Sequence, residues 1–227
     1  IVKPRYEGSG MGIDPGAVHP FLRGWSAGDA LAPAPLEEIA IRHTVGGADP
    51  LTAGDVAAGA RLDDGLPQTL EEYLRAERLR YFKVKLRGDE AADLERLGAI
   101  SALCDNRIPA AEPYFVTLDG NEQFRDPGAL VRLLEKMCSG LVPERFARAV
   151  LFIEQPYPRT IALDESVAPD LRRAARYRPL IIDESDENLQ SVPRALELGY
   201  AGFAVKSAKG PIKALLNAGA LAHHPDR

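Results

Sequence analysis

The sequence has few cysteines, no long apolar run and no excess of positive charge. Cys104 and Cys138 are too few for a disulfide framework and lack the spacing of metal ligands, so we expect reduced thiols without a redox role. No run of about 18 apolar residues is present, and residues Ile1 to Arg5 lack the apolar stretch of a signal peptide. These absences argue against a membrane protein and against secretion, and they favour the cytoplasm.

The charge balance limits the partners. The 227 residues include 28 Lys and Arg against 33 Asp and Glu, a net charge of -5, so we expect no basic surface for nucleic acid. Hydrophobic residues make up 45% of the chain and charged residues 27%, which is typical of a globular protein rather than a disordered one. The length allows one large domain or two small ones.

Two regions differ in regularity. Residues 1–37 contain scattered glycine and proline with little periodicity, which predicts an irregular lead-in. In residues 38–227, short apolar runs alternate with amphipathic stretches. The chain does not begin with Met and stops directly after a helix-like segment, so we expect it to be part of a longer protein.

Six short apolar runs predict six strands. They are Glu38 to His43, Tyr81 to Leu86, Tyr114 to Asp119, Val150 to Glu154, Leu180 to Asp183 and Gly202 to Lys206. The helices expected between them are Thr69 to Arg75, Asp89 to Leu103, Leu130 to Met137, Leu171 to Tyr177, Leu189 to Leu198 and Ile212 to Ala222. This alternation indicates parallel strands with helical crossovers, either in an open doubly wound sheet or in a (β/α) barrel. No Gly-x-Gly-x-x-Gly turn follows the first strand, which weakens a dinucleotide-binding open sheet.

Charged residues end five of the six predicted strands. Because side chains alternate between the two faces of a strand, these charges share one face and the apolar residues share the other. The charged residues are Lys83, Lys85, Asp119, Glu154, Asp183 and Lys206. In a barrel they would converge at the carboxyl-terminal mouth, where such barrels keep their active sites.

Three carboxylates at one mouth require a cation. Asp119, Glu154 and Asp183 would repel one another unless a positive ion neutralised them, and a set of oxygen ligands suits a hard ion such as Mg²⁺. Lys85 and Lys206 would flank that ion. Since the ammonium groups and the metal disfavour one another's charge, we expect at least one lysine to have a lowered pKa and to act as a base near neutral pH.

Other polar residues have ordinary structural explanations. Asp164 is expected to cap a helix and residues 186–188 to begin one. A lone histidine such as His43, at the end of the first predicted strand, is more often structural than catalytic. Lys209 could bind a substrate carboxylate or could belong to a loop, and Arg159 is equally undecided.

The combined motifs resemble the enolase superfamily. They are Lys83-Val84-Lys85, Asp119-Gly120-Asn121, Glu154-Gln155-Pro156, Asp183-Glu184-Ser185 and Val205-Lys206. Over roughly residues 38 to 222 the order and spacing are similar to those of the mandelate racemase/muconate lactonizing enzyme-like group. Lys206 after the sixth strand is similar to the two-lysine layout of the muconate lactonizing, o-succinylbenzoate synthase and dipeptide epimerase branch.

The resemblance implies a Mg²⁺-dependent enzyme that removes the proton α to the carboxylate of a small-molecule substrate. Asp119, Glu154 and Asp183 would be the metal ligands, and Lys85 and Lys206 would be acid/bases on opposite faces of the substrate carbon. The metal would stabilise the resulting enolate.

The other residues of the motifs would support this site. Lys83 would assist Lys85 electrostatically, and Asn121 would lie in the layer behind the ligands, where Lys209 would also lie unless it belongs to a loop. The enolate would lead to racemisation, epimerisation, dehydration or cycloisomerisation, so the enzyme would be an isomerase or a lyase.

The sequence departs from the family in two ways. Residues 1–37 are too short for the family's N-terminal capping domain, and its seventh and eighth strands are absent. The predicted fold is therefore an incomplete TIM-type (β/α) barrel of six strand–helix units. Two alternatives stay open: a Schiff-base aldolase in which Lys206 or Lys85 is the nucleophile, and a non-catalytic truncated barrel that binds metal or a partner. Many such barrels associate, so a homo-oligomer is also open, although no residue indicates one.

Overall fold

The computed structural model describes residues 14–30 and 34–225. In these residues six strands form one parallel sheet, and the order of the strands in the sheet follows their order in the chain. The strands are β1 (His43–Val45), β2 (Tyr81–Lys85), β3 (Phe115–Asp119), β4 (Val150–Glu154), β5 (Leu180–Ile182) and β6 (Gly202–Phe203). The predicted parallel α/β fold is therefore confirmed.

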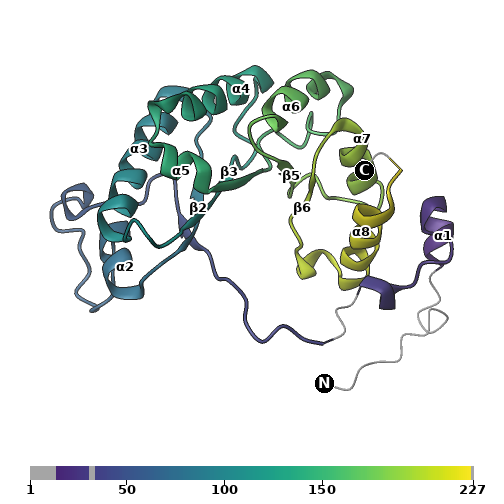
Figure 1. Ribbon diagram of the computed structural model, residues 1–227, viewed down its shortest axis with the longest axis horizontal. Coiled ribbons are helices and arrows are strands. Elements are labelled where there is room, and N and C mark those ends of the chain that lie inside the picture. Colours follow the sequence, from purple (N-terminus) through teal and green to yellow (C-terminus); the bar gives the residue numbers. More distant parts are fainter. Residues whose placement is uncertain (1–13, 31–33, 226–227) are drawn as a thin grey trace.

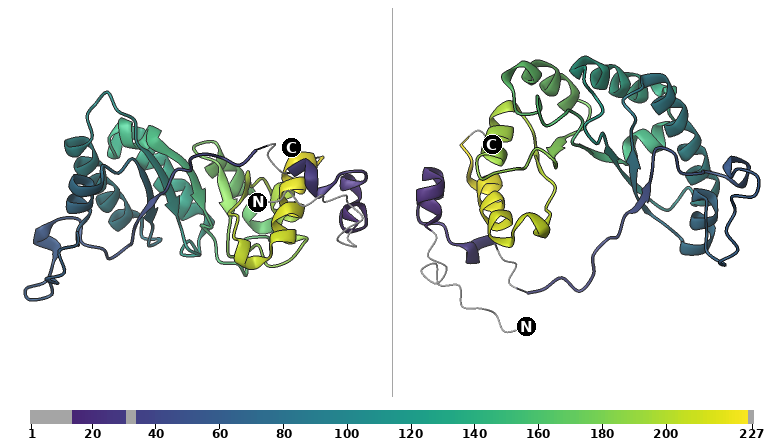
Figure 2. Two further views of the ribbon diagram at one scale, coloured as in Figure 1. Left: turned by 90° about the horizontal axis from the view of Figure 1, so that it is seen from below. Right: turned by 180° about the vertical axis from the view of Figure 1, so that it is seen from behind.

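Helices connect the strands. They are α2 (Leu70–Glu77), α3 (Glu90–Arg107), α4 (Pro127–Lys136), α5 (Glu144–Ala149), α6 (Ala168–Ala175), α7 (Ser191–Leu198) and α8 (Pro211–His223). Figure 1 shows that α2, α3, α4, α6, α7 and α8 follow one another along the outer side of the curved sheet. The view from behind in Figure 2 shows the same arc, with the strands on its inner side.

The hydrophobic core lies between the sheet and this layer of helices. On β2, Phe82 and Val84 are at most 1% exposed, and on β3, Val116 and Leu118 are fully buried. They belong to one cluster with apolar residues of the helices, such as Leu97 of α3. Because strand residues alternate, the other face of β2 and β3 carries the lysines and Asp119, as predicted.

Polar residues fix where the helices begin. The Thr69 side chain accepts a hydrogen bond from the backbone N–H of Glu72 at the start of α2. The Glu72 carboxylate in turn accepts a hydrogen bond from the backbone N–H of Gln68, just before the helix. Asp164 caps a short 3₁₀ turn, η5 (Glu165–Val167), which confirms its predicted role as a cap.

Both edge strands differ from the prediction. β1 spans His43–Val45, so the predicted strand Glu38 to His43 is wrong except at its last residue. Pairing of β1 begins at His43, which is opposite Phe82, while Ile39 and Ile41 before it are 75% and 79% exposed. Since β2 itself begins at Tyr81, earlier residues have almost nothing to pair with. Likewise, Phe203 at the end of β6 is opposite the last residue of β5, so the predicted extension to Lys206 is wrong.

A bulge changes the burial of β4. Val116 and Leu118 of β3 pair with Val150 and Ile153 of β4, so β4 contains one extra residue between them. Leu151, predicted to face the helices together with Ile153, is therefore 46% exposed.

The described part of the lead-in contains short helical turns. They are α1 (Pro15–Val18), η1 (Pro20–Leu22) and η2 (Ala27–Ala30), and both η1 and η2 contact α8. Leu22 is fully buried there. Residues 1–13 and 31–33 of the predicted lead-in lie outside the described residues. No helix within the described ranges is long and apolar enough to cross a membrane.

Candidate active site

The sheet brings the predicted charged residues together at the carboxyl ends of its strands. In the register of the sheet, Lys85 of β2 is opposite Asp119 of β3, and Asp119 is opposite Glu154 of β4. Asp183 directly follows β5. The three carboxylate residues are only 1–2% exposed. Neighbouring parallel strands thus present three buried acids at one edge.

Lys83 joins two of these acids. Its Nζ lies 2.7 Å from Oδ2 of Asp119 and 2.8 and 2.9 Å from the two carboxylate oxygens of Glu154. The Nζ of Lys85 lies 2.6 Å from the same Asp119 oxygen. Asp119 therefore faces two ammonium groups, and Lys83 bridges β3 and β4.

Asp183 has a similar environment. Lys206 donates a hydrogen bond to its Oδ2, and Nζ of Lys209 lies 3.2 Å from its Oδ1. The carboxyl groups of Asp183 and Glu154 lie close enough for each to influence the pKa of the other. Ion pairs between lysines and acids run along the ends of these strands, and we call the six residues the charged row: Lys83, Lys85, Asp119, Glu154, Asp183 and Lys206.

The pKa values of Glu154 and Asp183 are shifted in opposite directions. Burial raises the pKa of Glu154 against the hydrogen bond from Lys83, and the negative charge of Asp119 adds to the increase. Burial also acts to raise the pKa of Asp183, but the hydrogen bond from Lys206 and the influence of Glu154 and Lys209 outweigh it and lower that pKa.

The pKa values of Lys83 and Lys206 are raised, whereas we expected a lowered pKa for at least one of Lys85 and Lys206 beside a bound metal. Burial acts to lower the pKa of Lys83, but its contacts with Asp119 and Glu154 prevail and raise it. The hydrogen bond to Asp183 raises the pKa of Lys206. The prediction assumed a metal beside the amines, whereas here the carboxylates touch the amines directly and stabilise their charged form.

The carboxylate oxygens of Asp119, Glu154 and Asp183 are the kind of ligand that a hard divalent cation prefers. Three buried carboxylates lie on adjacent strands, and mutual repulsion contributes to the raised pKa of Glu154. Across residues 14–30 and 34–225, no group of three or more His, Cys, Asp or Glu side chains is placed so that it could hold a metal ion. In this structure the lysine ammonium groups neutralise the three carboxylates. Metal ligation by Asp119, Glu154 and Asp183 stays a prediction.

Two further residues adjoin the charged row. The backbone N–H of Asn121 donates to Oδ1 of Asp119, and its side-chain amide donates to Glu184 over 3.1 Å. Asn121 therefore lies directly behind Asp119. Arg42, just before β1, was missed by the sequence analysis: it donates to the hydroxyl of Thr117 over 2.8 Å and lies 4.0 Å from Glu154. No sequence signal marked Arg42, because its neighbours were assigned to a longer strand.

Other candidates lie outside the row. His43 begins β1 rather than ending a strand, and its ring contacts Tyr73 with centroids 4.4 Å apart. Arg159 forms ion pairs with Glu122 and Glu187. A helix start at residues 186–188 is wrong, because α7 begins at Ser191.

The carboxylate of Asp186 serves a different purpose. It is 4% exposed and binds Asn217 and Lys213 of α8. Its role is therefore to attach that helix to the loop after β5.

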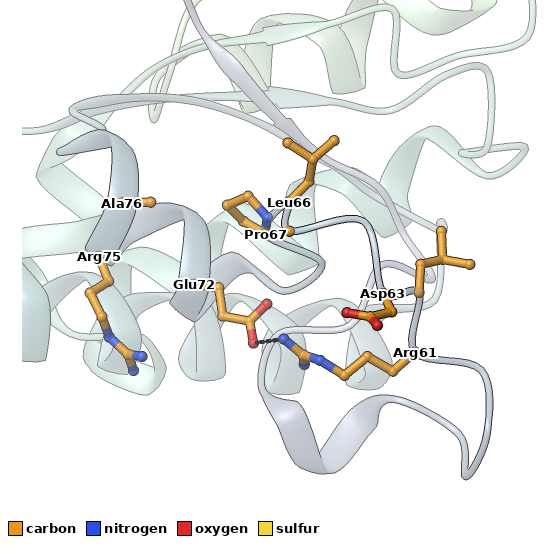
Figure 3. Close-up of a pocket in the computed structure, with 9 residues that line it drawn as sticks. Arg61, Asp63, Leu66, Pro67, Glu72, Arg75 and Ala76 are labelled. Carbon is orange, nitrogen blue, oxygen red and sulfur yellow. Dashed lines mark hydrogen bonds and ion pairs between the residues drawn. The ribbon is translucent and has the colours of Figure 1, made fainter.

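A separate hollow of about 420 Å³ lies beside α2. Figure 3 shows Arg61 reaching from the preceding loop to Glu72, with 2.6 Å between the paired atoms. No member of the charged row lines this hollow. The hollow beside α2 is therefore separate from the charged row.

Solved structures with a similar fold support the barrel assignment. A muconate cycloisomerase variant matches with a TM-score of 0.54 at 21% identity, over 83% of this chain and 45% of that one. A muconate lactonizing enzyme from Klebsiella pneumoniae matches with a TM-score of 0.52 at 22% identity, over 79% and 42%. A mandelate racemase/muconate lactonizing protein from Paracoccus denitrificans, complexed with magnesium, matches with a TM-score of 0.52 at 16% identity, over 79% and 43%.

These similarities define the fold. The chain is an α/β protein with part of a (β/α) TIM-type barrel, and it spans less than half the length of the three solved structures. No protein-family model matches it. No curated protein matches it either.

Proposed function

We propose that the chain is part of an enolase-superfamily enzyme of the mandelate racemase/muconate lactonizing enzyme-like group. The observation that carries this proposal is the charged row: three buried acids on β3, β4 and after β5, with amines at both ends. The fold of enzymes so named supports it, as does the order of the motifs in the sequence. The proposed reaction begins with removal of the proton α to a substrate carboxylate.

Two lysines have positions suited to proton transfer. Lys85 contacts Asp119 at one end of the row, and Lys206 contacts Asp183 at the other. A substrate carbon between them would present one face to each amine, so that one amine removes the proton and the other returns it. Contact with a carboxylate is what raises the pKa of Lys206, so an amine that leaves its carboxylate loses its proton more readily and becomes available to accept one from the substrate.

The remaining residues would hold the charges in place. Lys83 binds Asp119 and Glu154 together and keeps their oxygens on one side of the sheet. Asp119, Glu154 and Asp183 would hold Mg²⁺, which supplies positive charge to stabilise the negative charge that develops on the substrate carboxylate. One protein of similar fold is named as complexed with magnesium.

The products depend on the step after proton removal. Racemisation or epimerisation needs only return of the proton to the other face, whereas dehydration and cycloisomerisation break or form a further bond. The proposed enzyme is therefore an isomerase or a lyase acting on a small carboxylate.

The test combines metal binding with isotope exchange. Calorimetric titration with MgCl₂ is expected to show binding to the wild type and greatly reduced binding to Glu154→Gln. With Mg²⁺ present, a panel of small carboxylates in deuterated water is expected to include one whose α-proton exchanges with the wild type. Equal Mg²⁺ binding by both proteins, or none by the wild type, would contradict the proposed site.

The same experiments distinguish two other functions. A Schiff-base aldolase needs an uncharged nucleophilic amine and would give a covalent lysine adduct with a carbonyl substrate and borohydride. A non-catalytic barrel would bind Mg²⁺ without catalysing exchange of any substrate.

A further inference from the structure

Gln155 is a buried polar residue directly after β4 that the proposed reaction does not use. It is 1% exposed, and its φ of 36° lies in the left-handed region that residues other than glycine rarely adopt. A strained backbone at a buried polar residue persists only where surrounding contacts hold it in place.

The side chain of Gln155 makes every hydrogen bond available to an amide. Its Oε1 accepts from the backbone N–H of Asp183 over 2.7 Å and from that of Ser185 over 3.1 Å. Its Nε2 donates to the carbonyl of Tyr157 over 2.8 Å and to Oγ of Ser185 over 2.6 Å. Two acceptor and two donor positions are all occupied, which fixes the amide orientation.

These contacts continue the sheet beyond its last backbone pair. The N–H of Gln155 donates to the carbonyl of Ile181 over 2.8 Å. Beyond that point the Asp183 N–H is held by the Gln155 side chain rather than by the main chain of β4. Between β3 and β4, by contrast, the backbone itself continues the pairing, since the N–H of Gly120 donates to the carbonyl of Glu154.

We propose that Gln155 is a positioning residue that fixes the backbone of Asp183 beside Glu154. This inference rests on the proposed function for its catalytic meaning, because Asp183 is one of the proposed metal ligands. A glutamine suits the task because one amide supplies acceptors to two N–H groups and also donors that anchor it. All four hydrogen bonds of the Gln155 amide are made within the protein, so the residue acts through Asp183.

The test compares three variants by amide hydrogen exchange, followed by NMR in the metal-free protein. Gln155→Met keeps the length of the side chain and removes all four hydrogen bonds. Ser185→Ala is milder and removes one anchor of the amide. Tyr200→Phe is the matched control, because it removes one buried hydrogen bond, from Tyr200 to the carbonyl of Ala162, away from the row. The Ile153 amide, which donates to the carbonyl of Pro179, is the internal reference.

Selective loss of protection at Asp183 is the expected result. Relative to Ile153, exchange of the Asp183 amide should accelerate roughly tenfold in Gln155→Met, as expected for one lost buried hydrogen bond. It should accelerate less in Ser185→Ala and remain unchanged in Tyr200→Phe. Unchanged exchange at Asp183 in Ser185→Ala, or equal acceleration in Tyr200→Phe, would overturn the inference, even if Gln155→Met did not fold.

Titration with MgCl₂ separates this inference from the proposed function. If the wild type binds Mg²⁺, the Mg²⁺ affinity of Ser185→Ala and of Gln155→Met should fall by about the same factor as the protection of the Asp183 amide. The affinity of Tyr200→Phe should not fall. Unaltered affinity in Gln155→Met would overturn the positioning role. If the wild type binds no Mg²⁺, the proposed function fails, while the exchange of the Asp183 amide still decides whether Gln155 fixes this backbone.

Discussion

Asp119 and Glu154 are direct partners in the register of β3 and β4, so two buried carboxylates lie side by side on neighbouring strands. The ammonium group of Lys83 contacts both of them. Like charges so close are costly in a buried place unless a cation neutralises them. The pairing of the two strands therefore requires a positive charge beside these carboxylates for the fold to be stable.

Replacement of Lys83 tests this requirement. Lys83→Met should lower the free energy of unfolding by about 3 kcal/mol, because removal of one partner leaves buried charge uncompensated. Urea denaturation near neutral pH measures the change. Lys136→Met is the control, since Lys136 forms an ion pair with Glu90 at the surface, where its side chain is 48% exposed. Equal losses in the two variants would show that Lys83 has no special role.

The raised pKa of Glu154 predicts a pH dependence. A carboxyl group whose folded-state pKa is raised stabilises the protein at low pH, and this contribution is lost as pH rises from its ordinary value of 4.5 through the folded-state pKa. Glu154→Gln removes that loss. The stability of the variant relative to the wild type should therefore increase with pH in metal-free denaturation series. A difference that stays constant or decreases would contradict the assigned pKa direction.

Variants of the two terminal lysines test the proposed division of labour. Lys85→Ala and Lys206→Ala should each abolish α-proton exchange from at least one face of the substrate carbon, and Mg²⁺ affinity should remain within severalfold of the wild type. NMR of each substrate enantiomer in deuterated water measures the two faces separately. The control Lys136→Ala, at the surface of α4, should catalyse α-proton exchange at the wild-type rate. Full exchange in both site variants would show that the bases are misassigned.

Glycine substitutions test how closely the loops after β3 and β4 approach. A Cβ at Gly120 would lie 2.6 Å from Cα of Pro156, so Gly120→Ala should destabilise the protein by about 2 kcal/mol. Gly98, inside α3, has nothing within 4 Å of a Cβ, and Gly98→Ala should stabilise the protein by about 0.5 kcal/mol. Thermal unfolding compares the two. A harmless Gly120→Ala would mean that these loops separate easily.

The central strands could be predicted from the sequence because their signal is local. β2, β3 and β4 are rich in apolar residues and end in a charged residue, and each begins and ends within one residue of its predicted limits. Alternation then assigned Lys83 and Asp119 to the face opposite the core. Register in a parallel sheet follows from burial of one face, so the meeting of Asp119 with Glu154 was also accessible.

The edges depended on partners that a local pattern does not reveal. Ile39 and Ile41 look like strand residues, yet no residue of β2 extends far enough to pair with them. The six-residue helix α5 is too short to show helical periodicity. The pKa of Lys206 could not be anticipated either, since it depends on which neighbour the amine touches.

The two signs of charge in the site come from different parts of the sheet. The anions belong to β3 and β4 and to the loop after β5, whereas cations come from β2 and from the flanks, with Arg42 ahead of β1 and Lys206 and Lys209 after β6. Strand order repeats chain order, so a protease that trims either end removes positive charge before it reaches an acid. Such trimming would leave the buried carboxylates of β3, β4 and the loop after β5 without their counter-charges. The stability of the site therefore depends on both ends of the sheet being intact.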